Sequence, residues 1–107
     1  MSEPLIIENI CNIVIAEGLA ESEPDFCERW LCRNEGYIRT LRFRGLQPST
    51  DALTICADRL GYYAGVFEAS DRPSSQATGN SLRVLERLCK EAIDTAARAK
   101  WVGSSEY

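Results

Sequence analysis

Residues 26–45 read FCERWLCRNEGYIRTLRFRG, and this stretch predicts two short helices joined by a tight turn. Just before it, Ser22-Glu23-Pro24-Asp25 has the pattern of a helix cap, in which a serine hydroxyl accepts a hydrogen bond from the third helical amide. We therefore expect a first helix over Glu23 to Leu31. Its inward side chains follow the helical period and are Phe26, Cys27, Trp30 and Leu31.

The second helix of the pair is predicted over Asn34 to Arg44. Asn34 is a good capping residue, and Gly45 can end the helix. Ile38 and Leu41 give the helix an inward face. The connection would then be the three residues 32–34, which is the plan of a helix-turn-helix over residues 22–45.

Helical patterns flank this pair on both sides. After it, Pro48-Ser49 opens a further helix with a weak point at Gly61, because glycine costs about 1 kcal/mol in a helix relative to alanine. Before it, apolar residues recur at three-and-four spacing up to Gly18. That stripe comprises Ile6, Ile10, Ile13 and Val14, with Ile7 and Cys11 beside it.

The remainder of the chain predicts a linker and a tail helix. Residues 69–80 read ASDRPSSQATGN, a composition typical of a flexible linker between a helical domain over 1–68 and a C-terminal helix over 81–102. The tail helix could pack back on its own core or pair two subunits, and the pattern leaves both open. Candidate dimer-interface residues are Leu82, Leu85, Cys89, Ala92 and Ala96. The expected fold is all-α, a bundle of about four helices plus this C-terminal helix.

Composition indicates one soluble domain. The chain has 107 residues, of which 45 % are hydrophobic and 26 % charged, and this balance excludes an intrinsically disordered protein. No apolar run reaches the roughly 18 residues of a membrane span, and no basic residue precedes the first apolar stretch as in a secretory signal. We expect a cytoplasmic protein with no membrane partner.

The chain contains five cysteines and no histidine. Four of the cysteines fall on the apolar faces of the predicted helices, so we expect free, buried thiols in a reducing compartment. Without histidine, a zinc site and a Cys–His nucleophile would each lack a usual member. Neither a metal nor a cofactor is expected.

Charge is distributed unevenly along the chain. Residues 1–28 carry seven acidic residues and no basic one, whereas residues 29–44 carry five arginines and Glu35 as their single acid. The net charge of −4 argues against a broad nucleic-acid coat, but it leaves room for one basic face.

The order of these features over residues 22–61 resembles the phage-repressor class of helix-turn-helix proteins, the Cro, C1 or Xre type, with a lambda-repressor-like fold. It also resembles a group of small uncharacterised bacterial helix-turn-helix proteins. Cys32 stands where the class has a turn glycine, so we expect the turn to differ there. The matching positions are Phe26-Cys27, Leu31-Cys32, Ile38 with Leu41, Arg44-Gly45, Pro48-Ser49 and Leu60-Gly61.

The resemblance implies a DNA-binding transcriptional regulator that acts as a homodimer and reads the major groove of double-stranded DNA with the helix over 34–44. In this reading Arg39 bonds to guanine, Thr40 contacts a thymine methyl group and Glu35 accepts from cytosine. The candidate base-reading residues are Glu35, Gly36, Arg39 and Thr40. The candidate phosphate-binding residues are Arg33, Tyr37, Arg42 and Arg44.

Two alternatives stay open. Arg39 and Arg42 could instead pair with Asp25, with Glu28 or with carboxylates of the acidic first helix, and the protein would then be an interaction or adaptor module that binds no DNA. An enzyme is not expected, because the chain has no histidine, no phosphate-binding loop and no dinucleotide-binding glycine pattern.

Overall fold

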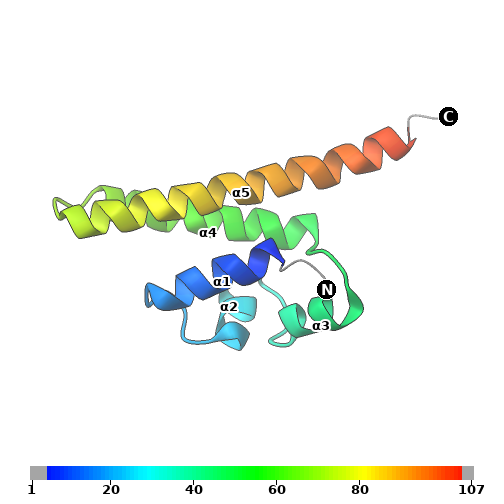
Figure 1. The fold of residues 1–107 in the computed structure, drawn as a ribbon, viewed down its shortest axis with the longest axis horizontal. Helices are drawn as coiled ribbons and strands as arrows, with labels where there is room; N and C mark the ends of the chain where they lie inside the picture. Colours follow the sequence, from blue (N-terminus) through cyan, green and yellow to red (C-terminus); the bar gives the residue numbers. More distant parts are fainter. Residues whose placement is uncertain (1–4, 105–107) are drawn as a thin grey trace.

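The computed structural model describes residues 5–104, and all regular structure in this range is helical. The prediction of an all-α chain is confirmed. The long helices α4 and α5 form an antiparallel pair, and the shorter α1, α2 and α3 gather along one side of it (Figure 1). Within the described range no helix is long and apolar enough to cross a membrane. The helices are α1 (Ile6–Ala16), α2 (Glu23–Trp30), α3 (Tyr37–Arg44), α4 (Thr50–Glu68) and α5 (Pro73–Ser104).

An aromatic stack lies at the centre of the core. Trp30 is fully buried between Phe26 and Tyr63, with ring centroids 5.9 and 5.3 Å away. The guanidinium of Arg59 lies over the indole, 5.9 Å from its centroid. Every buried residue in the described range is apolar, and Pro48 and Gly79 are among them. Burial of apolar surface, at about 1.5–3 kcal/mol for each large side chain, therefore supplies the main stabilisation.

Helix α1 presents a slightly different face from the predicted one. Ile7, Ile10 and Val14 are fully buried, whereas Ile13 is 36 % exposed. The residues of the observed stripe follow the i, i+3, i+7 spacing of a helix face. The predicted stripe was therefore wrong at Ile13, because the Ile7 side chain is the one that is buried.

Helix α2 begins as predicted. The Ser22 side chain accepts a hydrogen bond from the amide of Asp25 at 3.3 Å, so the predicted cap is confirmed. The helix buries Phe26, Cys27 and Trp30 and ends at Trp30. Leu31 follows it and is also buried.

The connection between α2 and α3 is longer than predicted. The Asn34 side chain accepts the amide of Gly36 at 2.8 Å and its carbonyl accepts the amide of Tyr37, so Asn34 forms a local turn instead of capping the helix. Short polar side chains often compete with helical hydrogen bonds in this way. Helix α3 therefore begins at Tyr37, not Asn34, and the connection spans residues 31–36.

Helix α4 agrees with its prediction, and α5 corrects one. The Ser49 cap is confirmed, with the Ser49 side chain accepting the amide of Ala52 at 3.1 Å, and α4 continues through Gly61 as one long helix. Helix α5 begins at Pro73, so most of the predicted 69–80 linker is helix. Proline suits a first helical position because its φ is already fixed there.

Gly79 explains why the linker prediction was wrong. A Cβ at this buried residue would lie 3.0 Å from Cγ of Glu68 and 3.3 Å from the carbonyl oxygen of Ala64. Glycine thus lets the start of α5 pack closely on the end of α4. The small and polar residues of 69–80, which predicted a linker, instead connect α4 and α5 and form the first turns of α5.

The tail helix packs back on its own chain. Leu82, Leu85 and Cys89 are buried within the chain, while Ala92 and Ala96 are half-buried. The first three are therefore not accessible to a second subunit in this conformation, so the predicted dimer interface is wrong at those positions. Only Ala92 and Ala96 of the predicted set remain partly open.

The cysteines follow the expectation of free, mostly buried thiols. None of the five is in a disulfide, and only Cys32 is exposed. Burial raises the pKa of Cys11 to about 12, with smaller contributions from the negative charges of Glu23 and Glu8. The Cys11 thiol is thus held in the neutral, unreactive form.

Candidate nucleic-acid interface

Helix α3 buries two side chains and exposes most of the others. Ile38 and Leu41 are buried, and Gly45 ends the helix in a left-handed conformation with φ of 64°. The amide of Leu46 then donates to the carbonyl of Leu41 at 3.0 Å. This C-terminal arrangement gives a carbonyl at the end of the helix a hydrogen-bond donor.

The outward face of α3 carries two arginines. Arg39, Thr40, Phe43 and Arg44 are all exposed and line one open hollow of about 370 Å³. Within the described residues neither Arg39 nor Arg44 forms an ion pair or a side-chain hydrogen bond. We call these four residues the α3 face.

The predicted base-reading residues lie near one another. Arg39 and Thr40 belong to the α3 face, and exposed Glu35 precedes the helix. Gly36 stands next to Arg39, since a Cβ there would be 3.0 Å from an Nη atom of Arg39. Glycine at this position therefore leaves room for the arginine at the start of the helix.

Arg42 points elsewhere. Its guanidinium donates to Glu8 of α1 at 3.2 Å and to Glu23 of α2 at 3.0 Å. These hydrogen bonds, that to Glu23 first, raise the pKa of Arg42 above its ordinary value. The alternative prediction, in which an arginine pairs with a carboxylate of the acidic first helix, is therefore confirmed for Arg42. The Arg42 guanidinium is bound by carboxylates of its own chain.

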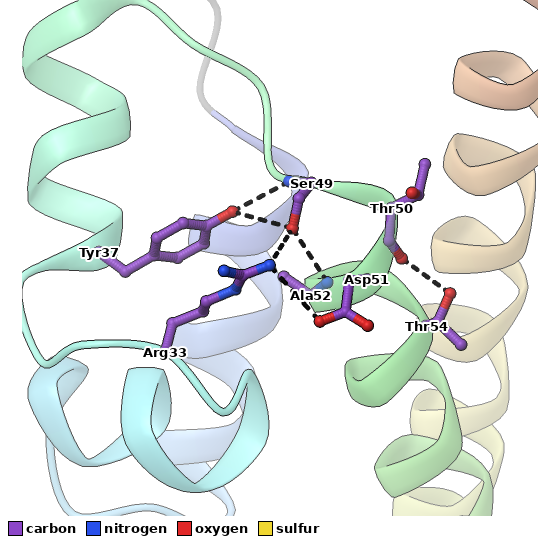
Figure 2. A network of polar contacts seen from close by, with 7 residues as sticks. All are labelled: Arg33, Tyr37, Ser49, Thr50, Asp51, Ala52 and Thr54. Carbon is purple, nitrogen blue, oxygen red and sulfur yellow. Dashed lines mark hydrogen bonds and ion pairs between the residues drawn. The ribbon is translucent and has the colours of Figure 1, made fainter. Parts of the chain in front are cut away.

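Arg33 and Tyr37 meet at the start of α4 (Figure 2). Arg33 Nη2 donates to Ser49 Oγ at 2.9 Å, and the Tyr37 hydroxyl accepts the Ser49 amide at 2.9 Å. Arg33 also lies over the Tyr37 ring, 5.5 Å from its centroid, and 3.5 Å from the carboxylate of Asp51. We call Arg33, Tyr37 and Ser49 the Ser49 cluster.

Electrostatics favour an anion beside this cluster. The N-terminus of a helix carries a partial positive charge, and α4 has 19 residues. Arg33 adds a full positive charge there. Asp51 opposes it, but that carboxylate is 72 % exposed and its ion pair with Arg33 is long, so the pair is weak.

Sequence reasoning missed two residues of this region. Ser49 was recognised as a helix cap, but its contacts with Arg33 and Tyr37 join residues 16 and 12 positions apart. The sequence pattern assigned no role to Phe43, whose side chain is 88 % exposed. The local signal for Phe43 was its place two residues after buried Leu41, which turns it to the opposite side of the helix.

Comparison with known proteins gives a family but no function. The model of a family of unknown function, DUF6626, matches residues 7–102, from α1 to the last turns of α5. Neither the curated proteins nor the solved structures gave a match. Because the family model spans most of the chain and all five helices, this protein belongs to the DUF6626 family.

Proposed function

We propose that this protein binds double-stranded DNA by placing the α3 face in the major groove, in the manner of a repressor-like helix-turn-helix. The observation that carries the proposal is the exposure of Arg39 and Arg44 on one hollow of α3, where neither guanidinium forms an ion pair with another described residue. Arg39 can bond to the acceptor edge of guanine, and Arg44 can meet a phosphate. Thr40 between them adds a methyl group and a hydroxyl.

The Ser49 cluster supports a phosphate contact beside the groove. Arg33 and the first amides of α4 offer donors to one anion, and a helix N-terminus favours such a charge. A DNA phosphate can displace the weak Asp51 ion pair at little cost. In this proposal Arg42 positions α3 by binding Glu8 and Glu23 and does not contact DNA.

A homodimer is the second part of the proposal. Helix α5 is thirteen residues longer than α4, and its C-terminal end continues past the start of α4 (Figure 1). We call residues 92–104 the overhang, although the first of them still lie beside the start of α4. Its small residues Ala92, Ala96 and Ala99 line an apolar groove of about 310 Å³ together with Ile6 and Pro48. Two copies related by a twofold axis could pair these stripes, since alanines allow close helix contact.

The test of DNA binding is fluorescence anisotropy with a pool of random-sequence duplexes at several salt concentrations. The logarithm of the affinity should fall with the logarithm of salt, by about 0.9 for each phosphate contact. An Arg39→Ala/Arg44→Ala double variant should bind more weakly and with a flatter slope. The matched control is Arg72→Ala/Arg87→Ala, which removes two exposed arginines outside the α3 face.

An adaptor is the second candidate function, and the apolar exposure at the end of α3 favours it. Phe43 is 88 % and Leu46 is 48 % exposed, and such side chains often form the centre of a protein interface. An adaptor predicts equal and negligible duplex binding by the parent and both double variants. Equal salt slopes for the parent and the α3 variant would therefore exclude the DNA proposal.

A further inference from the structure

Phe43 is the most exposed large hydrophobic side chain in the described part of the chain, at 88 %. Helix α3 buries Ile38 and Leu41 against the core, and Phe43 lies on the opposite side. An aromatic ring in water gives up the stabilisation that burial would provide. The fold therefore gives no reason for phenylalanine at this position.

The neighbours of Phe43 define the chemistry of a ligand. Arg39 lies one helical turn before Phe43 and Arg44 directly after it, and both guanidinium groups are without an ion pair in the described range. With Thr40 they line the hollow of about 370 Å³. A matching ligand offers negative charge or acceptor groups on both sides of an apolar group.

The major groove of DNA has one apolar group of this kind, the C5 methyl of thymine. Guanine presents two acceptors to an arginine in the same groove, and phosphates line its edges. Arg39 and Phe43 are four residues apart, about 6 Å along the helix axis. That distance corresponds to about two base-pair steps of about 3.4 Å, measured along the duplex axis.

We propose that Phe43 is a specificity-determining residue that contacts a thymine methyl group about two base pairs from a guanine bound by Arg39. This inference rests on the proposed DNA binding and names the sequence feature that the α3 face selects. Thr40 contributes a second, smaller apolar contact. The preferred site therefore contains a guanine and a thymine at this spacing, on the same strand or on opposite strands.

The test uses duplexes selected from a random pool by the full-length protein. Each thymine in the selected duplex is replaced in turn by deoxyuridine, which lacks only the methyl group. The parent protein should lose affinity about fourfold at one thymine, the effect of removing one buried carbon group. A Phe43→Ala variant should bind the parent duplex about as weakly as the deoxyuridine duplex and should show no further loss on replacement.

The control variant is Val66→Ala, which shortens an exposed apolar side chain on α4. It should keep the full fourfold sensitivity to the methyl group. Because Phe43 is exposed, its replacement should leave the helical circular dichroism spectrum unchanged.

The outcomes separate this inference from the proposed function. If the parent protein enriches no duplex, the DNA proposal itself fails. If it enriches a duplex but deoxyuridine has the same effect on the parent and on Phe43→Ala at every position, DNA binding stands and the role of Phe43 is overturned. The same conclusion follows if Phe43→Ala abolishes binding to a protein partner while leaving DNA affinity intact.

Discussion

Cys32 holds the backbone in a conformation that most residues avoid. Its φ is 52°, the only positive value at a residue other than glycine in the described range. The glycine that the phage-repressor class has at this turn would adopt the conformation freely. A residue with a side chain loses about 1 kcal/mol of stability there. The following amide, of Arg33, donates to the carbonyl of Cys27 at 2.9 Å and ties the turn to α2. The chain keeps the geometry of a glycine turn and accepts the strain.

Replacing Cys32 by glycine should stabilise the protein. We expect Cys32→Gly to raise the free energy of unfolding by about 1 kcal/mol, because the left-handed strain disappears and the exposed thiol makes little packing contribution. Urea denaturation followed by circular dichroism measures this. Cys32→Ala is the matched control, since it removes the thiol but keeps the strain. Equal stability of the two variants would show that the turn is not strained.

At the scale of elements, local signals predicted the helices whose ends depend on capping. Ser22 and Ser49 cap α2 and α4 as expected, and Gly45 ends α3. The starts of α3 and α5 were missed because they depend on competition between turns and packing. The Asn34 side chain can either cap a helix or accept a hydrogen bond within a turn, and the sequence alone does not distinguish these two arrangements.

The start of α5 depends on close contact at Gly79. We expect Gly79→Leu to lower the free energy of unfolding by about 1–3 kcal/mol, because its side chain would collide with Glu68 and the backbone of Ala64. Ala77→Leu is the matched control, an exposed position on the same helix. Thermal unfolding of both variants provides the measurement. If residues 69–80 were a flexible linker, the two substitutions would have equally small effects.

At the scale of the whole molecule, the site is decided by contacts between distant residues. Composition predicted a basic segment over residues 29–44, but not which arginines would be free. Arg42 is bound by Glu8, 34 residues away, and Arg33 by Ser49, 16 residues away. Because Arg29, Arg33 and Arg42 form ion pairs, Arg39 and Arg44 are the arginines of residues 29–44 that have no ion pair within the described range. The helical period predicts the exposure of Arg39 and Thr40, whereas the contacts of Arg33 and Arg42 depend on residues far away along the sequence.

The long dimension of the molecule, 54 Å against 28 and 26 Å, exceeds the length of α4 because α5 continues past it (Figure 1). If two copies pair through the overhang, a charge on its small-residue stripe should separate them. We expect Ala96→Glu to convert a dimer to a monomer, as measured by light scattering after gel filtration. The neighbouring Ala97→Glu places the same charge on an exposed position and should leave the dimer intact. A parent protein that is monomeric at all concentrations would contradict pairing through α5.

Binding of duplex DNA by the α3 face can be followed residue by residue with nuclear magnetic resonance. Titration of ¹⁵N-labelled protein with a random-sequence duplex should shift the amide signals of Arg39, Thr40, Phe43 and Arg44 first. Signals of residues 33–36 and of Ser49 should follow, since the Ser49 cluster lies beside the groove contact. Signals of the α4–α5 hairpin end around Gly79 should stay unchanged. Shifts confined to α4 and α5, or no shifts at low salt and excess duplex, would contradict the account.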